Sequence, residues 1–126
     1  MERKTLLVVE DNDRIRNALL NILRIIFKEY QIDEATNGIG AMRAIEEAEN
    51  IYSLIITDIK MPFMDGYELV LKLRAIDEYQ EVSIIGYSSR LDINYKEKGF
   101  NYYIYKIAEN IRQLINIIEN VLNVDE

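Results

Sequence analysis

Five side chains with acid, cation or hydroxyl chemistry follow directly after short apolar segments of the sequence: Glu10, Asp11, Asp58, Ser88 and Lys106. Carboxylates that meet repel one another and hold their protons unless a cation enters. Oxygen ligands without histidine or cysteine suit a hard ion, and Mg²⁺ needs only one or two carboxylates plus waters. A lysine and a hydroxyl opposite such acids complement a tetrahedral anion. The set therefore predicts a phosphoryl-transfer site, with a carboxylate as a candidate acceptor.

Each of these residues also has an ordinary structural interpretation. Asp58 can cap or turn the loop that follows it, and the Glu10-Asp11 pair can complement the dipole of a following helix. Ser88 fits a loop hydroxyl, and Lys106 fits a solvated lysine at the end of a strand. The site interpretation depends on whether the fold brings these residues together.

The composition excludes several classes of chemistry. The 126 residues contain no cysteine and no histidine, which removes disulfides, zinc–thiolate sites and the serine–histidine–aspartate relay. The formal net charge of −7 argues against duplex nucleic acid as a partner. No apolar run approaches the roughly 20 residues that span a bilayer, and residues 1–13 lack the long apolar stretch and the small-residue cleavage site of a signal peptide. We expect one cytoplasmic domain over residues 1–126, without a nucleic-acid or membrane partner.

Short apolar runs alternate with amphipathic stretches along the chain. The runs predict five strands, over Thr5–Val9, Gln31–Ala35, Leu54–Thr57, Ser83–Tyr87 and Tyr102–Tyr105. The amphipathic stretches predict five helices. Four of them have apolar stripes at helical spacing: Ile15, Leu19, Ile22 and Ile26, then Ala41, Ile45 and Ala48, then Leu69, Leu73 and Ile76, and finally Ile111, Leu114, Ile115, Ile118 and Leu122. Asp13 is the expected N-cap of the first helix. The polar segment 90–98, the fourth of the five helices, is the weakest helix candidate. Tyr67, Tyr79 and Tyr95 are expected at the surface or at its boundary with the core.

This alternation predicts an α/β fold, a parallel five-stranded sheet covered by helices on both faces and joined by right-handed crossovers. Open sheets of this kind bind ligands beyond the carboxyl ends of their strands, where the strand order reverses. The candidate site residues all follow strands, so the fold would bring them to that one edge.

Four motifs in this order and spacing resemble the receiver domain of two-component response regulators, including the chemotaxis regulators. They are LLVVEDND (6–13), LIITDIKMPFMDGYEL (54–69), SIIGYSS (83–89) and GFNYYIYK (99–106). The stretch D-x-x-M-P-x-M-D-G that begins at Asp58 is the most specific of them, and the resemblance covers essentially the whole chain. It implies a flavodoxin-like, doubly wound sheet of strand order 2-1-3-4-5.

The resemblance also implies which residues take the phosphoryl group and hold the metal. Asp58 matches the phosphoacceptor, which takes the group from a phosphohistidine on a sensor histidine kinase or a histidine phosphotransfer domain. Asp11 matches the acid that binds Mg²⁺ directly, and Glu10 the acid that usually holds it through water. The backbone carbonyl of Lys60 matches the third protein ligand.

Three further residues match the groups that respond to phosphorylation. Lys106 matches the lysine that bonds the phosphoryl oxygens, and Ser88 the hydroxyl that moves onto the phosphoryl group. Tyr103 matches the aromatic switch residue that turns inward as the hydroxyl moves. The added charge would thereby bias a two-state loop and strand face.

The chain departs from the family pattern around the site. Ile107 stands where a proline usually follows the lysine, so we expect a trans Lys106–Ile107 bond, because a cis bond before a non-proline residue costs about 2.5–4 kcal/mol. Only eleven positions separate Ser88 from Gly99, about one helical turn fewer than is usual, which predicts a stub or an irregular loop there and an altered output face. Ser89 replaces a small apolar residue.

Two cations near the site, Lys60 and Arg90, predict an effect on the lifetime of the phosphorylated state. They could attract the phosphoryl group or hinder an attacking water.

The leading hypothesis is a stand-alone phospho-acceptor switch that alters a protein-binding surface and catalyses only its own phosphotransfer and dephosphorylation. A pseudo-receiver scaffold that is not phosphorylated is the alternative. A Mg²⁺-dependent phosphatase with an aspartyl nucleophile is a third class, suggested by Asp11-Asn12-Asp13, although the chain is too short for the usual cap domain.

Overall fold

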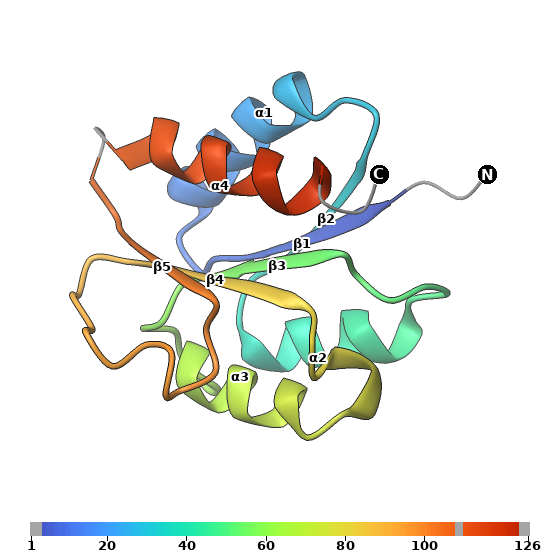
Figure 1. The fold of residues 1–126 in the computed structure, drawn as a ribbon, viewed down its shortest axis with the longest axis vertical. Coiled ribbons are helices and arrows are strands. Elements are labelled where there is room, and N and C mark those ends of the chain that lie inside the picture. The colour runs from blue at the N-terminus through green and yellow to red at the C-terminus, as the bar shows by residue number, and fades with distance from the viewer. Residues whose placement is uncertain (1–3, 108–109, 124–126) are drawn as a thin grey trace.

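The computed structural model describes residues 4–107 and 110–123, in which strands alternate with helices along the chain (Figure 1). Its centre is a parallel sheet of five strands: β1 (Thr5–Val9), β2 (Gln31–Ala35), β3 (Leu54–Thr57), β4 (Ser83–Ser88) and β5 (Tyr102–Tyr105). The spatial order is β2-β1-β3-β4-β5, as the resemblance implied. The strand order reverses between β1 and β3, so their carboxyl ends flank the place where such sheets bind ligands.

Helices cover both faces of the sheet and make two apolar cores (Figure 1). Helices α1 (Asp13–Ile26) and α4 (Ile111–Asn123) lie on one face, and α2 (Gly38–Glu47) and α3 (Gly66–Arg74) lie on the other. A short 3₁₀ helix, Asp77–Tyr79, follows α3. The central strands β1 and β3 are buried on both faces, which explains why their sequences are continuous apolar runs. None of the described helices is both long and apolar enough to cross a membrane.

The first helix differs from the prediction in its cap and in its buried face. Asn12, and not Asp13, is the N-cap: its side-chain oxygen accepts the Ile15 N–H at 3.0 Å. Asn12 stays extended because its own N–H donates to the Glu10 carboxylate at 3.0 Å. The buried face consists of Arg16, Leu19, Leu20 and Leu23, whereas Ile26, expected in the stripe, is 44% exposed.

Smaller differences concern the other elements. Ile76 lies beyond the end of α3, where it precedes the 3₁₀ helix, and β4 runs one residue further than predicted, to Ser88. Tyr79 is buried, not at the surface, because its hydroxyl oxygen accepts the Tyr52 N–H at 3.1 Å.

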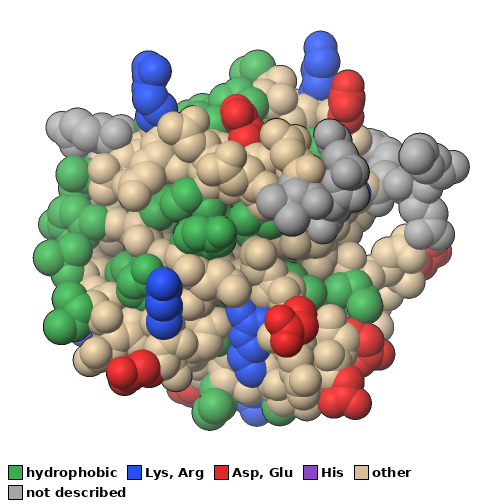
Figure 2. All heavy atoms as spheres, in the orientation of Figure 1, with side chains coloured by type: hydrophobic (Ala, Val, Ile, Leu, Met, Phe, Trp, Pro, Cys, Tyr) green, Lys and Arg blue, Asp and Glu red, His purple; other side chains and the backbone are tan. Residues whose placement is uncertain are grey.

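The segment between β4 and β5, residues 89–101, contains turns and no helix, and all of its residues are described. This agrees with the short spacing from Ser88 to Gly99. The Lys106–Ile107 bond is trans, as predicted. Hydrophobic side chains gather at the left edge of the space-filling view, where the ribbon of this segment lies (Figure 2). Within the segment, Leu91 is 77% exposed and Ile93 is 92% exposed.

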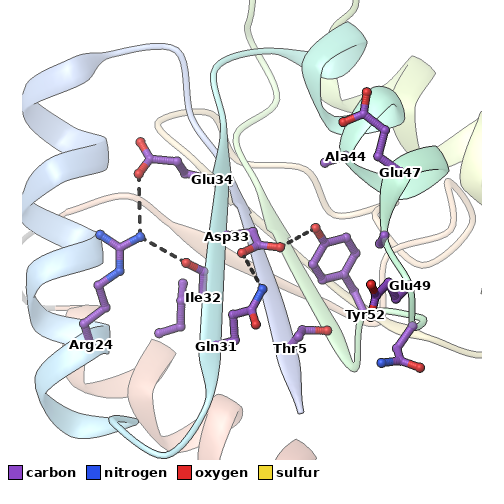
Figure 3. A pocket seen from close by; sticks show the side chains of 12 residues that line it. Thr5, Arg24, Gln31, Ile32, Asp33, Glu34, Ala44, Glu47, Glu49 and Tyr52 are labelled. Carbon is purple, nitrogen blue, oxygen red and sulfur yellow. Dashed lines mark hydrogen bonds and ion pairs between the residues drawn. The ribbon is translucent and has the colours of Figure 1, made fainter. Parts of the chain in front are cut away.

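A polar groove of about 850 Å³ lies beside β2, near the amino ends of β1 and β2 and away from the predicted site (Figure 3). Several of its polar side chains are hydrogen-bonded within the groove. The Tyr52 hydroxyl donates to Asp33 at 2.7 Å, and Arg24 donates to the carbonyl of Ile32 at 3.0 Å. Arg24 thereby covers part of the open edge of the sheet, which would otherwise invite pairing with another strand.

Candidate functional site

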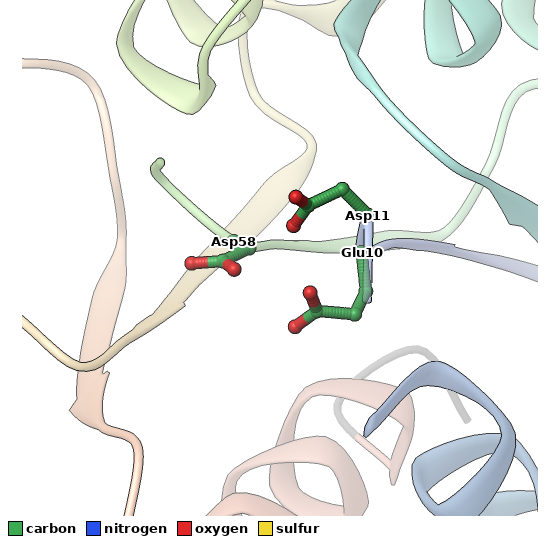
Figure 4. Close-up of side chains that lie close together, drawn as sticks. All are labelled: Glu10, Asp11 and Asp58. Carbon is green, nitrogen blue, oxygen red and sulfur yellow. The ribbon is translucent and has the colours of Figure 1, made fainter. Parts of the chain in front are cut away.

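Three carboxylates converge where β1 and β3 end (Figure 4). Glu10 and Asp11 follow β1 and Asp58 follows β3, and each offers an oxygen that lies within 4.8 Å of the others. Glu10 is 2% exposed, Asp58 is half-buried and Asp11 is exposed. The fold thus brings together the acids that the sequence singled out.

Lys106 connects two of these acids from the far end of β5. Its ammonium donates to Asp58 Oδ2 at 2.9 Å and to Glu10 Oε1. The ammonium also lies 5.5 Å from the centre of the Tyr87 ring, which stabilises a cation over its face. Burial opposes the charge of Lys106, but the hydrogen bonds to Glu10 and Asp58 raise its pKa above the ordinary value. The lysine therefore stays a cation between the two acids.

Glu10 is the acid whose ionisation is most affected. Burial raises the pKa of Glu10 to about 7, against the opposing hydrogen bonds from Lys106 and from the Asn12 N–H. A buried carboxyl group with a raised pKa binds a cation readily, because the cation stabilises the charged form that water no longer solvates.

The set of donors fits a hard divalent cation. When the three carboxyl groups are ionised, one ammonium leaves two negative charges uncompensated. All the side-chain donors are oxygens, which Mg²⁺ prefers, and Asp11 is exposed at the open side of the group. The proposed contribution of the Lys60 carbonyl stays a prediction.

Main-chain contacts fix the loop that carries Asp58. Asp58 Oδ1 accepts the Ile59 N–H at 2.7 Å, and the Ile59 carbonyl accepts the Gly66 N–H at 2.7 Å. Asp65 caps α3 by accepting the Glu68 N–H at 2.9 Å. Phe63 has a φ of 71°, a strained value for a bulky residue, and it is 82% exposed.

The two predicted switch residues lie on β4 and β5, the strands next to β3. Ser88 is 1% exposed, and its hydroxyl accepts the Arg90 N–H at 3.2 Å. Tyr103 is half-buried, and its hydroxyl donates to the Arg90 carbonyl at 2.7 Å. Both side chains therefore bind the main chain of one residue.

Sequence reasoning missed one contributor, Arg16. It is 7% exposed, donates to the Glu10 carbonyl at 2.9 Å and to Asp13 at 2.6 Å, and so fixes the chain where β1 ends. The available signal was an arginine inside the apolar pattern of the first helix.

The model of the response regulator receiver domain matches residues 6–123. This chain belongs to that family. Among curated relatives of the receiver domain, Histidine kinase P4 of Formosa agariphila is 34% identical over 94% of this chain, and Sensor protein EvgS of Escherichia coli is 34% identical over 79% of it. The chain spans only 9% and 8% of these two proteins.

Solved structures show the same fold. A putative response regulator from Chloroflexus aurantiacus has a TM-score of 0.82 and 28% identity, with 97% of this chain and 99% of that chain covered. The response regulator TrrA of Thermotoga maritima, in complex with Mg²⁺ and BeF, has a TM-score of 0.79 and 26% identity over 94% of this receiver domain and 98% of its own chain.

Proposed function

We propose that this receiver domain is a phospho-acceptor signalling switch in which Asp58 takes a phosphoryl group in a Mg²⁺-dependent reaction. The observation that carries the proposal is the Lys106 ammonium, held between Asp58 and Glu10 beside a group of three carboxylates. Such an arrangement combines a nucleophilic oxygen, a cation and a set of metal ligands, the parts that phosphoryl transfer needs.

In the transfer step, an Asp58 carboxylate oxygen attacks the phosphorus atom as the bond from phosphorus to the donor breaks. The electron pair of that bond leaves with the donor, a histidine nitrogen or, with a small acyl phosphate, a carboxylate oxygen. The product is an acyl phosphate on Asp58. The chain itself contains no histidine, so the phosphohistidine belongs to another domain, and we infer a sensor histidine kinase or a histidine phosphotransfer domain as the partner.

The chain's own charges prepare the step. Glu10, Asp11, Asp58 and the Lys60 carbonyl would hold Mg²⁺, which supplies positive charge to the phosphoryl oxygens when bound. Lys106 already contacts Asp58, so it can transfer its hydrogen bond to a phosphoryl oxygen without crossing the site. The Ile59 N–H fixes the other carboxylate oxygen and so orients the nucleophile.

The response depends on Ser88 and Tyr103. A phosphoryl group on Asp58 adds charge and acceptor oxygens beyond β3, and the Ser88 hydroxyl at the end of β4 is a donor for them. The hydroxyl oxygen accepts the Arg90 N–H while its own hydrogen is free to donate, so a movement of Ser88 toward the phosphoryl group either breaks the bond to Arg90 or moves Arg90 with it. The conformational change then reaches the β4–β5 side of the molecule, where we place the surface that a downstream protein binds.

The test is a mass measurement on the intact protein after incubation with Mg²⁺ and acetyl phosphate. We expect wild type to gain the mass of one phosphoryl group and Asp58→Asn to gain none. Asp77→Asn, an exposed residue of the 3₁₀ helix, is the matched control and should behave as wild type. An adduct that persists in Asp58→Asn would contradict the assignment of the acceptor. Absence of any adduct would favour a pseudo-receiver, and steady turnover of added phosphate esters would favour a phosphatase.

A further inference from the structure

In the loop between β4 and β5, residues 89–101, one carboxylate joins the part that follows Ser88 to α3. Asp92 Oδ2 accepts hydrogen bonds from the Tyr67 hydroxyl and from the Lys98 ammonium, both at 2.7 Å. Its other oxygen accepts the Asn94 N–H at 2.8 Å, and the Asp92 side chain is only 7% exposed. The ammonium also lies 4.4 Å from the centre of the Tyr67 ring. We refer to Tyr67, Asp92 and Lys98 as the Asp92 clasp.

The clasp is two residues from the main chain that both switch residues bind. The Arg90 N–H donates to Ser88 and the Arg90 carbonyl accepts from the Tyr103 hydroxyl. The Tyr103 ring also stacks on Tyr95 of the same loop, with 5.7 Å between the ring centres. A change in Ser88 or Tyr103 must therefore break these bonds or move Arg90. A movement of Arg90 would displace Asp92, two residues further along the chain, and so weaken the hydrogen bonds of the clasp.

Apolar burial does little to hold the loop at this point. The two neighbours of Asp92 in sequence, Leu91 and Ile93, are 77% and 92% exposed. The loop contains no helix whose hydrogen bonds would fix Arg90. Segments with few buried apolar contacts open at low cost, so the charged hydrogen bonds of the clasp, together with the bond from the Tyr103 hydroxyl, fix the position of this part of the loop.

We propose that Asp92 is a positioning residue of the switch: the clasp holds Arg90 where it retains Ser88 and Tyr103, and so favours the unphosphorylated arrangement. A contact present in one of two states and broken in the other shifts the equilibrium by its own free energy. The inference rests on the proposed function. It adds a residue outside the site, on a loop, that sets how readily the domain responds.

The experiment measures the binding of beryllofluoride with Mg²⁺ to wild type and to Asp92→Asn. We expect about three- to tenfold tighter binding by the variant, because weakening the clasp raises the fraction of molecules in the competent state. Asp92→Asn should at the same time lower the free energy of unfolding. A purely structural role would not produce tighter binding together with lower stability.

The matched control is Glu97→Gln, which removes a charge from an exposed position in the same loop and should bind as wild type. Tyr67→Phe keeps the ring and removes one donor, so we expect a smaller gain from it. It also serves as the test if Asp92→Asn does not fold. Unchanged or weaker binding in the folded clasp variants, while wild type binds, would overturn the inference alone. If wild type does not bind beryllofluoride, the proposed function fails. Faster amide exchange in the loop of Asp92→Asn would then show that the clasp holds the loop but does not regulate a switch.

Discussion

The two loops that border the site are held in different ways. In the β3–α3 loop, which carries the phosphoacceptor candidate, main-chain groups bind main-chain groups: the Gly66 N–H donates to the Ile59 carbonyl, and the Gly38 N–H of α2 donates to the Met64 carbonyl at 3.2 Å. Ile59 and Met61 are also buried. The position of Asp58 therefore follows from the path of the backbone.

In the β4–β5 loop, side chains hold the critical part. The Tyr103 hydroxyl and the Asp92 clasp fix Arg90 and the residues after it. The far end is secured by Arg74 of α3, which donates to the Gly99 carbonyl at 2.7 Å and to the Asn101 side chain at 2.8 Å. The loop is thus anchored where it enters β5, whereas near Ser88 its position depends on a few side-chain hydrogen bonds.

This difference matches the tasks that we propose for the two loops. A nucleophile must stay close to its reactive geometry, which favours a rigid support. A responding element must have two arrangements of similar free energy, which favours a few polar contacts over a buried core. Changes to the first loop should therefore impair the chemistry, and changes to the second should alter the response.

The largest effect is expected from Gly66→Ala, at the end of the first loop where α3 begins. A Cβ at Gly66 would lie 2.4 Å from the Asp58 carbonyl and 2.8 Å from the Ile59 Cα, so the backbone that carries Asp58 must move. We expect the rate of phosphorylation by acetyl phosphate to fall about a hundredfold, because small misplacements cost that much. The free energy of unfolding should fall by about 1–3 kcal/mol.

Gly40→Ala in α2 is the control for this variant. Its Cβ would meet its nearest neighbour at 3.6 Å, an ordinary contact, and alanine is the better helix former. Phosphorylation should match wild type, and the free energy of unfolding should be equal or up to about 1 kcal/mol higher. Equal rates in Gly66→Ala and Gly40→Ala, from mass time courses, would show that the first loop is not rigid.

A smaller effect is expected at acid pH, on the stability that the Asp92 clasp gives to the second loop. The hydrogen bonds from Lys98 and Tyr67 lower the pKa of Asp92 below its ordinary 3.8, although burial opposes this. The clasp therefore contributes fully above that value and is lost as the pH falls through the lower pKa of the folded state. Burial and the hydrogen bond to Asp92 raise the pKa of Tyr67, so its hydroxyl keeps its proton over this range.

The measurement is urea unfolding of wild type and Asp92→Asn at several pH values. The difference between their free energies of unfolding should be constant near neutral pH and should shrink below about pH 4. As the pH falls, the protection of amides against exchange should decrease in the second loop of wild type before it decreases in the first. A difference that stays constant down to pH 3 would mean that Asp92 is not held by its charge.

The sequence predicts the first loop much better than the second. The acceptor, the turn at Asp65-Gly66 and the strand before them lie in one continuous motif, so local pattern is sufficient there. The contact between Tyr67 and Asp92 joins residues 25 positions apart, and the loop that contains Asp92 has no periodicity from which to infer it. Only the missing helix in this loop could be predicted, from its length.

The first helix shows a different limit of sequence reasoning. Isoleucine lies on both its inner and its outer sides, and Ile25 is 76% exposed, so two apolar stripes compete in the pattern. The side that faces the sheet also contains Arg16, which is stabilised there by the hydrogen bond that it donates to the Glu10 carbonyl. Hydrophobic spacing does not register a buried arginine.

The smallest expected effect compares one cation from each loop. Lys60 lies in the first loop and Arg90 in the second, and both are exposed. Lys60 lies between the buried residues Ile59 and Met61, so we expect its side chain to stay near the acceptor and to hinder an attacking water. We expect Lys60→Ala to shorten the lifetime of the acyl phosphate by about two- to fivefold, the range that exposed charges reach. Arg90→Ala should change the lifetime less, because its loop must move on phosphorylation and carries the side chain with it. Decay of the phosphorylated mass over time measures both, and a larger effect from Arg90→Ala would mean that the second loop stays closed over the phosphoryl group.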